Sequence, residues 1–261
     1  MKSIRAVIRI LLVAISTITL YIIYYISYLI GKIFRAKYEP LRNFFMTLWA
    51  NTILFILNIH VQVKGHPPKA PFFLISNHLS YIDILPLYQN LDCTFVAKKE
   101  VESWPLIGYM AKTMGIIFID RTRKVDVGRV NRIISNSLHE DQGIVLFPEG
   151  TTSSGERVLP FKASLLEHPA SIELDVNYAT ISYQTSEKDP PASESVCWWG
   201  GISFSAHTLR LVKNRRIECQ IIFGSDTVSN PDRKKLADEL YEKVNQQFKP
   251  VTDGLTSDSE A

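Results

Sequence analysis

The run of the chain that most restricts its fold lies near the N-terminus, where residues 10–30 include no charged side chain. Basic residues flank this run: Lys2, Arg5 and Arg9 before it, and Lys32, Arg35 and Lys37 after it. As a helix the run would extend roughly 30 Å, the thickness of a bilayer's apolar core. A cleaved signal peptide has a shorter apolar region and a small-residue cleavage site, and neither is evident here. We therefore expect residues 1–37 to form an N-terminal membrane anchor, and a buried core helix is the alternative.

A second apolar stretch covers residues 44–59. It is too short to span a bilayer comfortably, and Asn51 and Asn58 interrupt it. An amphipathic helix over residues 38–59, lying in the membrane interface or packing on the domain, is favoured over a second crossing.

Composition narrows the class of protein. The 261 residues are 46% hydrophobic, enough for one large α/β domain with an appendage. The net charge of +3 is small and no basic stretch is interleaved with aromatic residues, so no nucleic-acid partner is expected. Cys93, Cys197 and Cys219 are scattered, without the spacing of a metal site or a disulfide framework, which favours a reducing compartment and no metal.

From residue 60 onward, short apolar strands alternate with helical patterns. This alternation predicts an α/β fold, with a mostly parallel sheet and helices on both faces. One domain is expected over residues 60–250, followed by a polar, disordered tail over 251–261. A helix is predicted over 126–139, and Asn230 followed by Pro231 suggests the start of a final helix. The predicted strands cover residues 60–64, 72–76, 94–97, 115–119, 143–147, 176–183 and 217–223.

A histidine and an aspartate, His78 and Asp83, follow the second predicted strand. An imidazole beside a carboxylate can remove a proton from a hydroxyl group, because the carboxylate fixes the tautomer and stabilises the imidazolium. In a regular helix, residues five apart lie roughly 140° apart around the axis. The side chains can therefore meet only if His78 precedes the first helical turn and Asp83 lies within it. The alternative is an ordinary surface pair.

Three further segments end near the same predicted edge of the sheet. Arg121 follows the fourth strand, and its planar guanidinium suits a phosphate; an exposed arginine paired with Asp120 is the alternative. A Pro-Glu-Gly-Thr turn follows the fifth strand, with candidate ligand-binding residues Glu149, Gly150 and Thr151. Such a turn also forms readily without any ligand. Lys162 is a further candidate cation for this crevice, and a solvated lysine is the alternative.

Taken in order, these motifs resemble those of the glycerolipid acyltransferase family. The resemblance covers residues 71–223 and includes the linking segment Phe95-Val96-Ala97-Lys98-Lys99-Glu100. It implies a glycerol-3-phosphate-acyltransferase-like fold and transfer of an acyl group from acyl-CoA or acyl-carrier protein to a lysophospholipid at a membrane. By similarity, His78 and Asp83 are catalytic and Arg121 binds the phosphate, with help from the Pro-Glu-Gly-Thr turn. No cofactor and no covalent enzyme intermediate are implied.

Two departures leave the acceptor open. Many members of the family carry an arginine where this chain has Thr152, and the branched segment over 176–183 has no proline. The leading expectation is a 1-acylglycerol-3-phosphate acyltransferase that makes phosphatidic acid. The alternatives are transfer to another lysolipid, such as a lyso-aminolipid, a catalytically silent lipid-binding protein, or a hydrolase. Because acyl thioesters are cytosolic, the catalytic domain is expected on the cytoplasmic side of the membrane.

Overall fold

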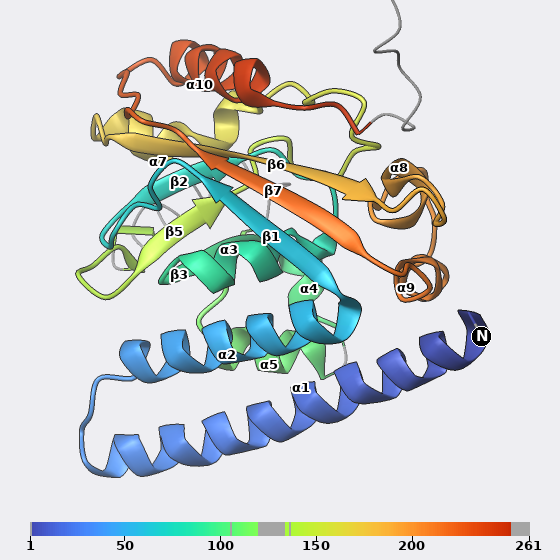
Figure 1. Cartoon of the computed structure of the whole chain (residues 1–261). Coiled ribbons are helices and arrows are strands. Elements are labelled where there is room, and N and C mark those ends of the chain that lie inside the picture. The colour runs from blue at the N-terminus through green and yellow to red at the C-terminus, as the bar shows by residue number, and fades with distance from the viewer. Residues whose placement is uncertain (1, 105, 120–133, 136, 252–261) are drawn as a thin grey trace, which may run out of the picture.

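The computed structural model describes residues 2–104, 106–119, 134–135 and 137–251. Within these residues, seven strands form one sheet in the order β1-β7-β6-β2-β5-β3-β4 (Figure 1). The strands are β1 (Ile59–Lys64), β2 (Phe73–Ser76), β3 (Cys93–Lys98), β4 (Ile117–Ile119), β5 (Gly143–Leu146), β6 (Val176–Thr185) and β7 (Ile217–Phe223). The described helices are α1 (Lys2–Ile33), α2 (Glu39–Leu57), α3 (Ile84–Asn90), α4 (Lys99–Glu102), α5 (Ile107–Thr113), α7 (Glu167–Ser171), α8 (Ala192–Ser195), α9 (Phe204–Leu211) and α10 (Arg233–Gln247), with short 3-10 helices η1 (Tyr81–Asp83) and η3 (Ala163–Leu165).

All strand pairs in this sheet are parallel except β6 with β7. This confirms the predicted mostly parallel α/β fold. Each predicted strand is present, and the ends shift by up to two residues. The fourth strand begins at Ile117 instead of residue 115 because Gly115 has φ +75°, a left-handed conformation that belongs to the turn after α5.

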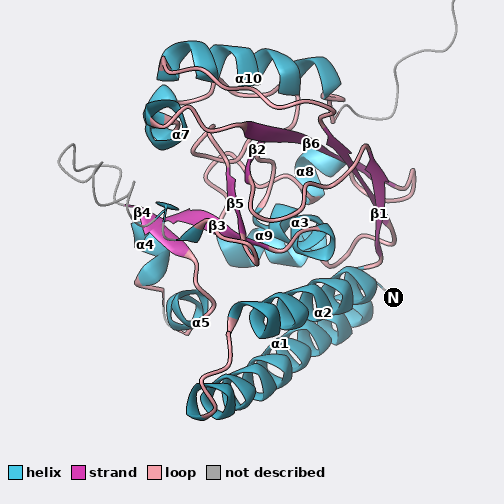
Figure 2. Ribbon diagram, turned by 90° about the vertical axis from the view of Figure 1, so that its left-hand side faces the viewer, coloured by secondary structure: helices cyan, strands magenta, loops and turns pink. Residues whose placement is uncertain are grey.

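Helices cover both faces of the sheet, as predicted (Figures 1 and 2). Alternate residues of β2 illustrate the two layers, since successive side chains of a strand point to opposite faces. Leu74 packs in the core shared with α2 and α3, whereas Phe73 and Ile75 pack in the core shared with α7 and α10. All three side chains are fully buried. The central strand is therefore enclosed on both sides, which gives the segment that follows it a rigid starting point.

The final helix, α10, buries a stripe of Leu236, Leu240 and Val244. Its start differs from the expectation that Asn230 would cap it. Asp232 is the N-cap, because its carboxylate accepts hydrogen bonds from the N–H groups of Lys234 (2.8 Å) and Lys235 (3.4 Å). Asn230 instead accepts the Asp232 N–H at 2.9 Å. Most of the helix predicted over 126–139 lies outside the described residues.

The two N-terminal helices run side by side along one edge of the molecule (Figure 1). By length and composition, α1 could cross a membrane over Ser3–Ile33, and most of its apolar side chains are exposed. Its inner face packs on the domain: Tyr24 donates to the carbonyl of Thr113 (3.0 Å), and Trp49 of α2 donates to Thr17 (3.0 Å). In α2, the side chains of Met46, Ala50, Ile53, Leu54 and Leu57 are buried. The second apolar stretch thus packs on the domain, one of the two arrangements that the sequence favoured.

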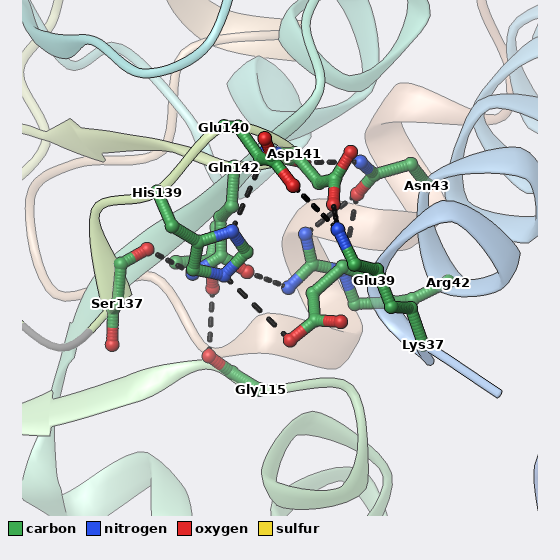
Figure 3. Close-up of polar contacts among 11 residues, drawn as sticks. Lys37, Glu39, Arg42, Asn43, Gly115, Ser137, His139, Glu140, Asp141 and Gln142 are labelled. Atoms are coloured by element: carbon green, nitrogen blue, oxygen red, sulfur yellow. Dashed lines mark hydrogen bonds and ion pairs between the residues drawn. The ribbon is translucent and has the colours of Figure 1, made fainter. Parts of the chain in front are cut away.

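A buried polar cluster fixes the start of α2 (Figure 3). Arg42, 1% exposed, donates to the side-chain oxygens of Asn43 and Gln142. Asn43 in turn donates to the carbonyl of Asp141 (2.8 Å), and Lys37 pairs with Glu140 and Asp141 at the surface. A buried cation needs hydrogen-bond acceptors for its donors. Because Gln142 and Asp141 supply acceptors to Arg42 and Asn43, the cluster holds α2 against the segment before β5.

Candidate active site

The catalytic candidate His78 lies just beyond β2, at the carboxyl end of the sheet. Its neighbour Asn77 is fully buried and takes the place of a strand residue in pairing with β6. The Asn77 side chain donates to the carbonyl of Ile181 (2.9 Å) and accepts the Ile181 N–H (2.7 Å). These two bonds hold the chain against β6 while it leaves the sheet. His78 therefore occupies the crevice position typical of ligand sites in open α/β sheets.

The imidazole of His78 and the carboxylate of Asp83 are in direct contact. Nδ1 of His78 lies 2.8 Å from Oδ2 of Asp83. His78 precedes the single turn η1, and Asp83 is the last residue of that turn. This is the geometry that the sequence requires if residues five apart are to meet, whereas a regular helix would separate them.

Asp83 is completely buried and its carboxylate is saturated with hydrogen bonds. Besides His78, Oδ2 accepts the N–H groups of Leu79 (2.7 Å) and Ser80 (3.0 Å), and Oδ1 accepts the hydroxyl of Tyr183 (2.9 Å). Burial and the negative Asp83 raise the pKa of Tyr183 well above its ordinary value, so Tyr183 stays a neutral donor. Four donors around one buried carboxylate fix its position.

Aromatic rings hold the plane of the His78 side chain. The imidazole stacks on Phe147 with ring centres 4.0 Å apart and planes 10° apart, and Phe147 stacks on Phe95 at 5.9 Å. The His78 side chain is 20% exposed. With Nδ1 bound to Asp83, Nε2 is the nitrogen that can accept a proton from a hydroxyl group.

Glu149 connects the Pro-Glu-Gly-Thr turn to the segment that contains His78. Its Oε1 accepts the backbone N–H of His78 at 2.9 Å, its carboxylate also accepts the N–H of Leu159, and the residue is 1% exposed. Among the described residues, its buried Oε2 has no hydrogen-bond partner. Burial raises the pKa of Glu149 to about 8, although the two N–H groups favour the ionised form. In addition, Ser153 N–H donates to the carbonyl of His78 (3.1 Å), so Glu149 and Ser153 bind the N–H and the carbonyl of the same residue.

The structure brings most of the predicted site residues to one edge of the sheet. β2 and β5 are adjacent and parallel, so His78 and Asp83 meet the turn that contains Glu149, Gly150 and Thr151. Gly150 has φ +70°, a conformation suited to glycine, and Thr151 is exposed.

The outcome differs for the two predicted cations. Lys162 has an exposed side chain, and its backbone N–H donates to the carbonyl of Pro148 (2.9 Å), beside the turn. Arg121 lies outside the described residues. The strand before it, β4, is three strand positions from β2, a separation of roughly 14 Å.

Sequence reasoning missed several residues that shape the site. Asn77 stands directly before His78 but no pattern distinguishes it from a turn residue. Tyr183 lies 100 residues from Asp83 along the chain, and only the pairing of β2 with β6 brings it near. At the position where many family members carry an arginine, Thr152 donates its hydroxyl to the carbonyl of Trp198.

Comparison with known proteins shows the family of this chain. Residues 58–183 match the family model described as Acyltransferase. The lyso-ornithine lipid O-acyltransferase of Rhizobium meliloti is 30% identical over 213 residues, covering 77% of this chain and 73% of that protein. The chain belongs to the acyltransferase family. The 1-acyl-sn-glycerol-3-phosphate acyltransferase of Neisseria meningitidis is 28% identical to this acyltransferase over 201 residues, covering 74% of this chain and 76% of the relative.

A solved structure shares the fold of this acyltransferase. PlsC from Thermotoga maritima, described as a 1-acyl-sn-glycerophosphate acyltransferase, superposes with a TM-score of 0.65 and 18% identity. The match covers 95% of this chain and 98% of PlsC, so it includes the N-terminal helices as well as the sheet.

Replacing Asp83 tests the buried carboxylate. Asp83→Asn puts an amide where four donors converge, so at least one donor loses its acceptor and Nδ1 of His78 is no longer held as a donor. We expect kcat to fall by roughly 10³- to 10⁴-fold, as for other histidine–aspartate pairs. Tyr183→Phe removes only one of the four bonds and should cost about tenfold or less. Steady-state acyl-transfer assays measure both, and equal losses in the two variants would contradict this ranking.

Substitutions of Glu149 test whether this residue acts by positioning the backbone of His78 or by its own negative charge. Glu149→Gln keeps an oxygen acceptor for the His78 N–H, so this variant should retain most of the acyl-transfer rate. Glu149→Ala removes the acceptor and should lower the rate about tenfold or more, since a hydrogen bond lost at a buried N–H costs roughly 1–3 kcal/mol. An activity of the glutamine variant as low as that of the alanine variant would show that the charge itself is required.

The raised pKa of Glu149 also predicts a pH dependence of stability. Between about pH 4.5 and pH 8 the folded state keeps a proton on Glu149 that the unfolded state releases. The free energy of unfolding should therefore fall as pH rises through this window, and the fall should be smaller in Glu149→Gln. Chemical denaturation of the detergent-solubilised protein at several pH values measures the difference. Identical pH dependence in both proteins would contradict the assignment.

Proposed function

We propose that this acyltransferase transfers an acyl group from acyl-CoA or acyl-carrier protein to the free hydroxyl of 1-acylglycerol-3-phosphate, forming phosphatidic acid. The observation that carries the proposal is the contact of His78 with the buried, fully hydrogen-bonded Asp83. That arrangement supports an imidazole whose Nε2 is available as a general base. The names of the Neisseria meningitidis and Thermotoga maritima proteins support the acceptor.

The proposed reaction is a direct transfer. Nε2 of His78 takes the proton of the acceptor hydroxyl while the hydroxyl oxygen attacks the thioester carbonyl. The carbon–sulfur bond then breaks, and the proton on His78 passes to the departing thiolate. Burial raises the pKa of the thiols of Cys93, Cys197 and Cys219, which argues against a cysteine nucleophile and in favour of transfer without a covalent enzyme intermediate.

The acceptor's phosphate is proposed to bind Arg121, with Gly150, Thr151 and Lys162 along the same rim. Thr151 and Lys162 have exposed side chains next to the turn that contacts His78, which is compatible with a ligand outside the sheet edge. Glu149 contributes by fixing the backbone of His78.

A lyso-ornithine lipid is the second candidate acceptor. This zwitterionic lipid lacks a phosphate, so it would not need the arginine that many family members carry after the Pro-Glu-Gly-Thr turn. Thr152 stands at that position and uses its hydroxyl to bind the Trp198 carbonyl. The name of the Rhizobium meliloti relative points to the same acceptor.

We expect α1 to anchor the enzyme in the membrane, with the catalytic domain on the cytoplasmic side, where acyl thioesters are made. The long exposed apolar face of α1 supports contact with lipid. Its inner contacts with Thr113 and with Trp49 of α2 support a catalytic domain held directly against the bilayer.

An acyl-transfer assay tests the proposed function. Membranes that contain the protein would receive labelled acyl-CoA or acyl-carrier protein, with lysophosphatidate, a lyso-ornithine lipid or lysophosphatidylethanolamine as acceptor. We expect labelled phosphatidic acid from the wild type and at least a 10³-fold loss in His78→Ala.

The exposed histidine variant His66→Ala is the matched control and should keep wild-type activity. Transfer to the lyso-ornithine lipid alone would select the second candidate. Transfer to no acceptor, or transfer that His78→Ala leaves unchanged, would overturn the mechanism.

A further inference from the structure

One helix outside the assigned site, α9, contacts the catalytic turn directly. Tyr81, the first residue of η1, lies between His78 and Asp83 in the sequence. Its hydroxyl is 2.9 Å from Oγ1 of Thr208 and 3.2 Å from Nδ1 of His207, both in α9. The ring of Tyr81 also packs against Phe204, with centres 4.9 Å apart, and against His207 at 5.3 Å.

The groups at this junction are neutral. Burial raises the pKa of Tyr81 to about 12 and lowers the pKa of His207, which is fully buried. The link between α9 and the catalytic turn is therefore a pair of directional hydrogen bonds, which constrains position more tightly than an exposed ion pair would.

The segment just before α9 binds both halves of the site. The backbone N–H of Trp198 donates to the carbonyl of Leu79 (2.8 Å), next to His78. The carbonyl of Trp198 accepts the hydroxyl of Thr152, which follows the Pro-Glu-Gly-Thr turn. The indole of Trp198 packs edge-on against Tyr81, with ring centres 5.5 Å apart. Residues 198–211 thus contact both segments that form the candidate active site.

The other end of α9 is bound to the N-terminal helix (Figure 1). Arg9 of α1 is 8% exposed and donates to the carbonyls of Val212 and Asn214. Arg5 donates to the carbonyl of Lys213 at 3.1 Å. Val212 is the C-cap of α9, and Lys213 and Asn214 follow it directly, so the two guanidinium groups bind the carboxyl end of α9 and the turn after it.

We propose that α9 is a positioning element that couples α1 to the catalytic turn. α1 fixes the carboxyl end of α9, and α9 holds Tyr81, so that the turn between His78 and Asp83 keeps a set place relative to the membrane helix. Tyr81, Thr208 and Arg9 are positioning residues in this arrangement. The inference rests on the proposed function, because it assumes that His78 and Asp83 carry out the transfer.

A conservative pair of substitutions tests the positioning contact. Thr208→Val removes the hydroxyl that binds Tyr81 at nearly constant volume, whereas Thr208→Ser keeps it. In lipid vesicles of phosphatidylethanolamine and phosphatidylglycerol, we expect Thr208→Val and Tyr81→Phe to lower kcat roughly 10-fold, with KM for donor and acceptor unchanged. Thr208→Ser should stay within about twofold of the wild type. A raised KM at unchanged kcat, or equal losses in Thr208→Ser and Thr208→Val, would overturn the positioning role.

The coupling to α1 needs a second comparison. Arg9→Gln removes the guanidinium that binds the end of α9, and it should also lower kcat without raising KM. In the double variant Arg9→Gln with Thr208→Val, the fold-loss in kcat should be much smaller than the product of the two single fold-losses, because both substitutions release the same helix. Lys32→Gln, which removes an exposed charge from the other end of α1, is the matched control and should leave kcat unchanged. Independent, multiplicative losses would overturn the coupling.

His78→Ala separates this inference from the proposed function. If His78→Ala keeps its activity, the proposed mechanism fails and the inference fails with it. If His78→Ala is inactive while Thr208→Val, Tyr81→Phe and Arg9→Gln all retain wild-type kcat, only the inference is overturned.

Discussion

The buried carboxylate of Asp83 is the constraint on which the rest of the site depends. A carboxylate with no exposure to water is costly unless every oxygen has donors, and Asp83 has four: one side-chain nitrogen, two backbone N–H groups and one tyrosine hydroxyl. Three of these donors come from residues 78–80, directly before η1, and the fourth comes from β6. The turn can therefore satisfy Asp83 only in the conformation that also brings His78 to it. The geometry that the proposed catalysis requires and the electrostatic cost of burying Asp83 impose the same local structure.

The surrounding contacts keep His78 from moving within that frame. Phe147 fixes the plane of the imidazole, and Glu149 accepts the His78 backbone N–H. Both residues follow β5, the strand paired with β2, so the sheet places them without any long connection. On the other side, Tyr81 binds α9, which binds the N-terminal helix. A site built from loops thereby gains the rigidity of the sheet and of the helix expected at the membrane.

Local patterns in the sequence were sufficient for much of this structure. The strand positions, the parallel sheet and the meeting of His78 with Asp83 all follow from apolar runs and from the geometry of one helical turn. The donor from Tyr183 could not be predicted, because it depends on β6 lying beside β2 and no short-range signal specifies that pairing. Asp232 caps α10 in place of Asn230, a choice that the sequence does not determine because both residue types can cap and the backbone angles decide between them. The role of Arg121 stays a prediction, because it falls outside the described residues.

The protonation state of the His78 ring tests the central claim most directly. Nitrogen NMR of the detergent-solubilised protein, labelled at histidine and assigned with His78→Ala, distinguishes the two ring nitrogens. If Asp83 orients His78 as a general base, the neutral ring should have its proton on Nδ1 and a free lone pair on Nε2. A neutral ring with its proton on Nε2 would contradict the account, because that tautomer cannot take a proton from the acceptor at the exposed nitrogen.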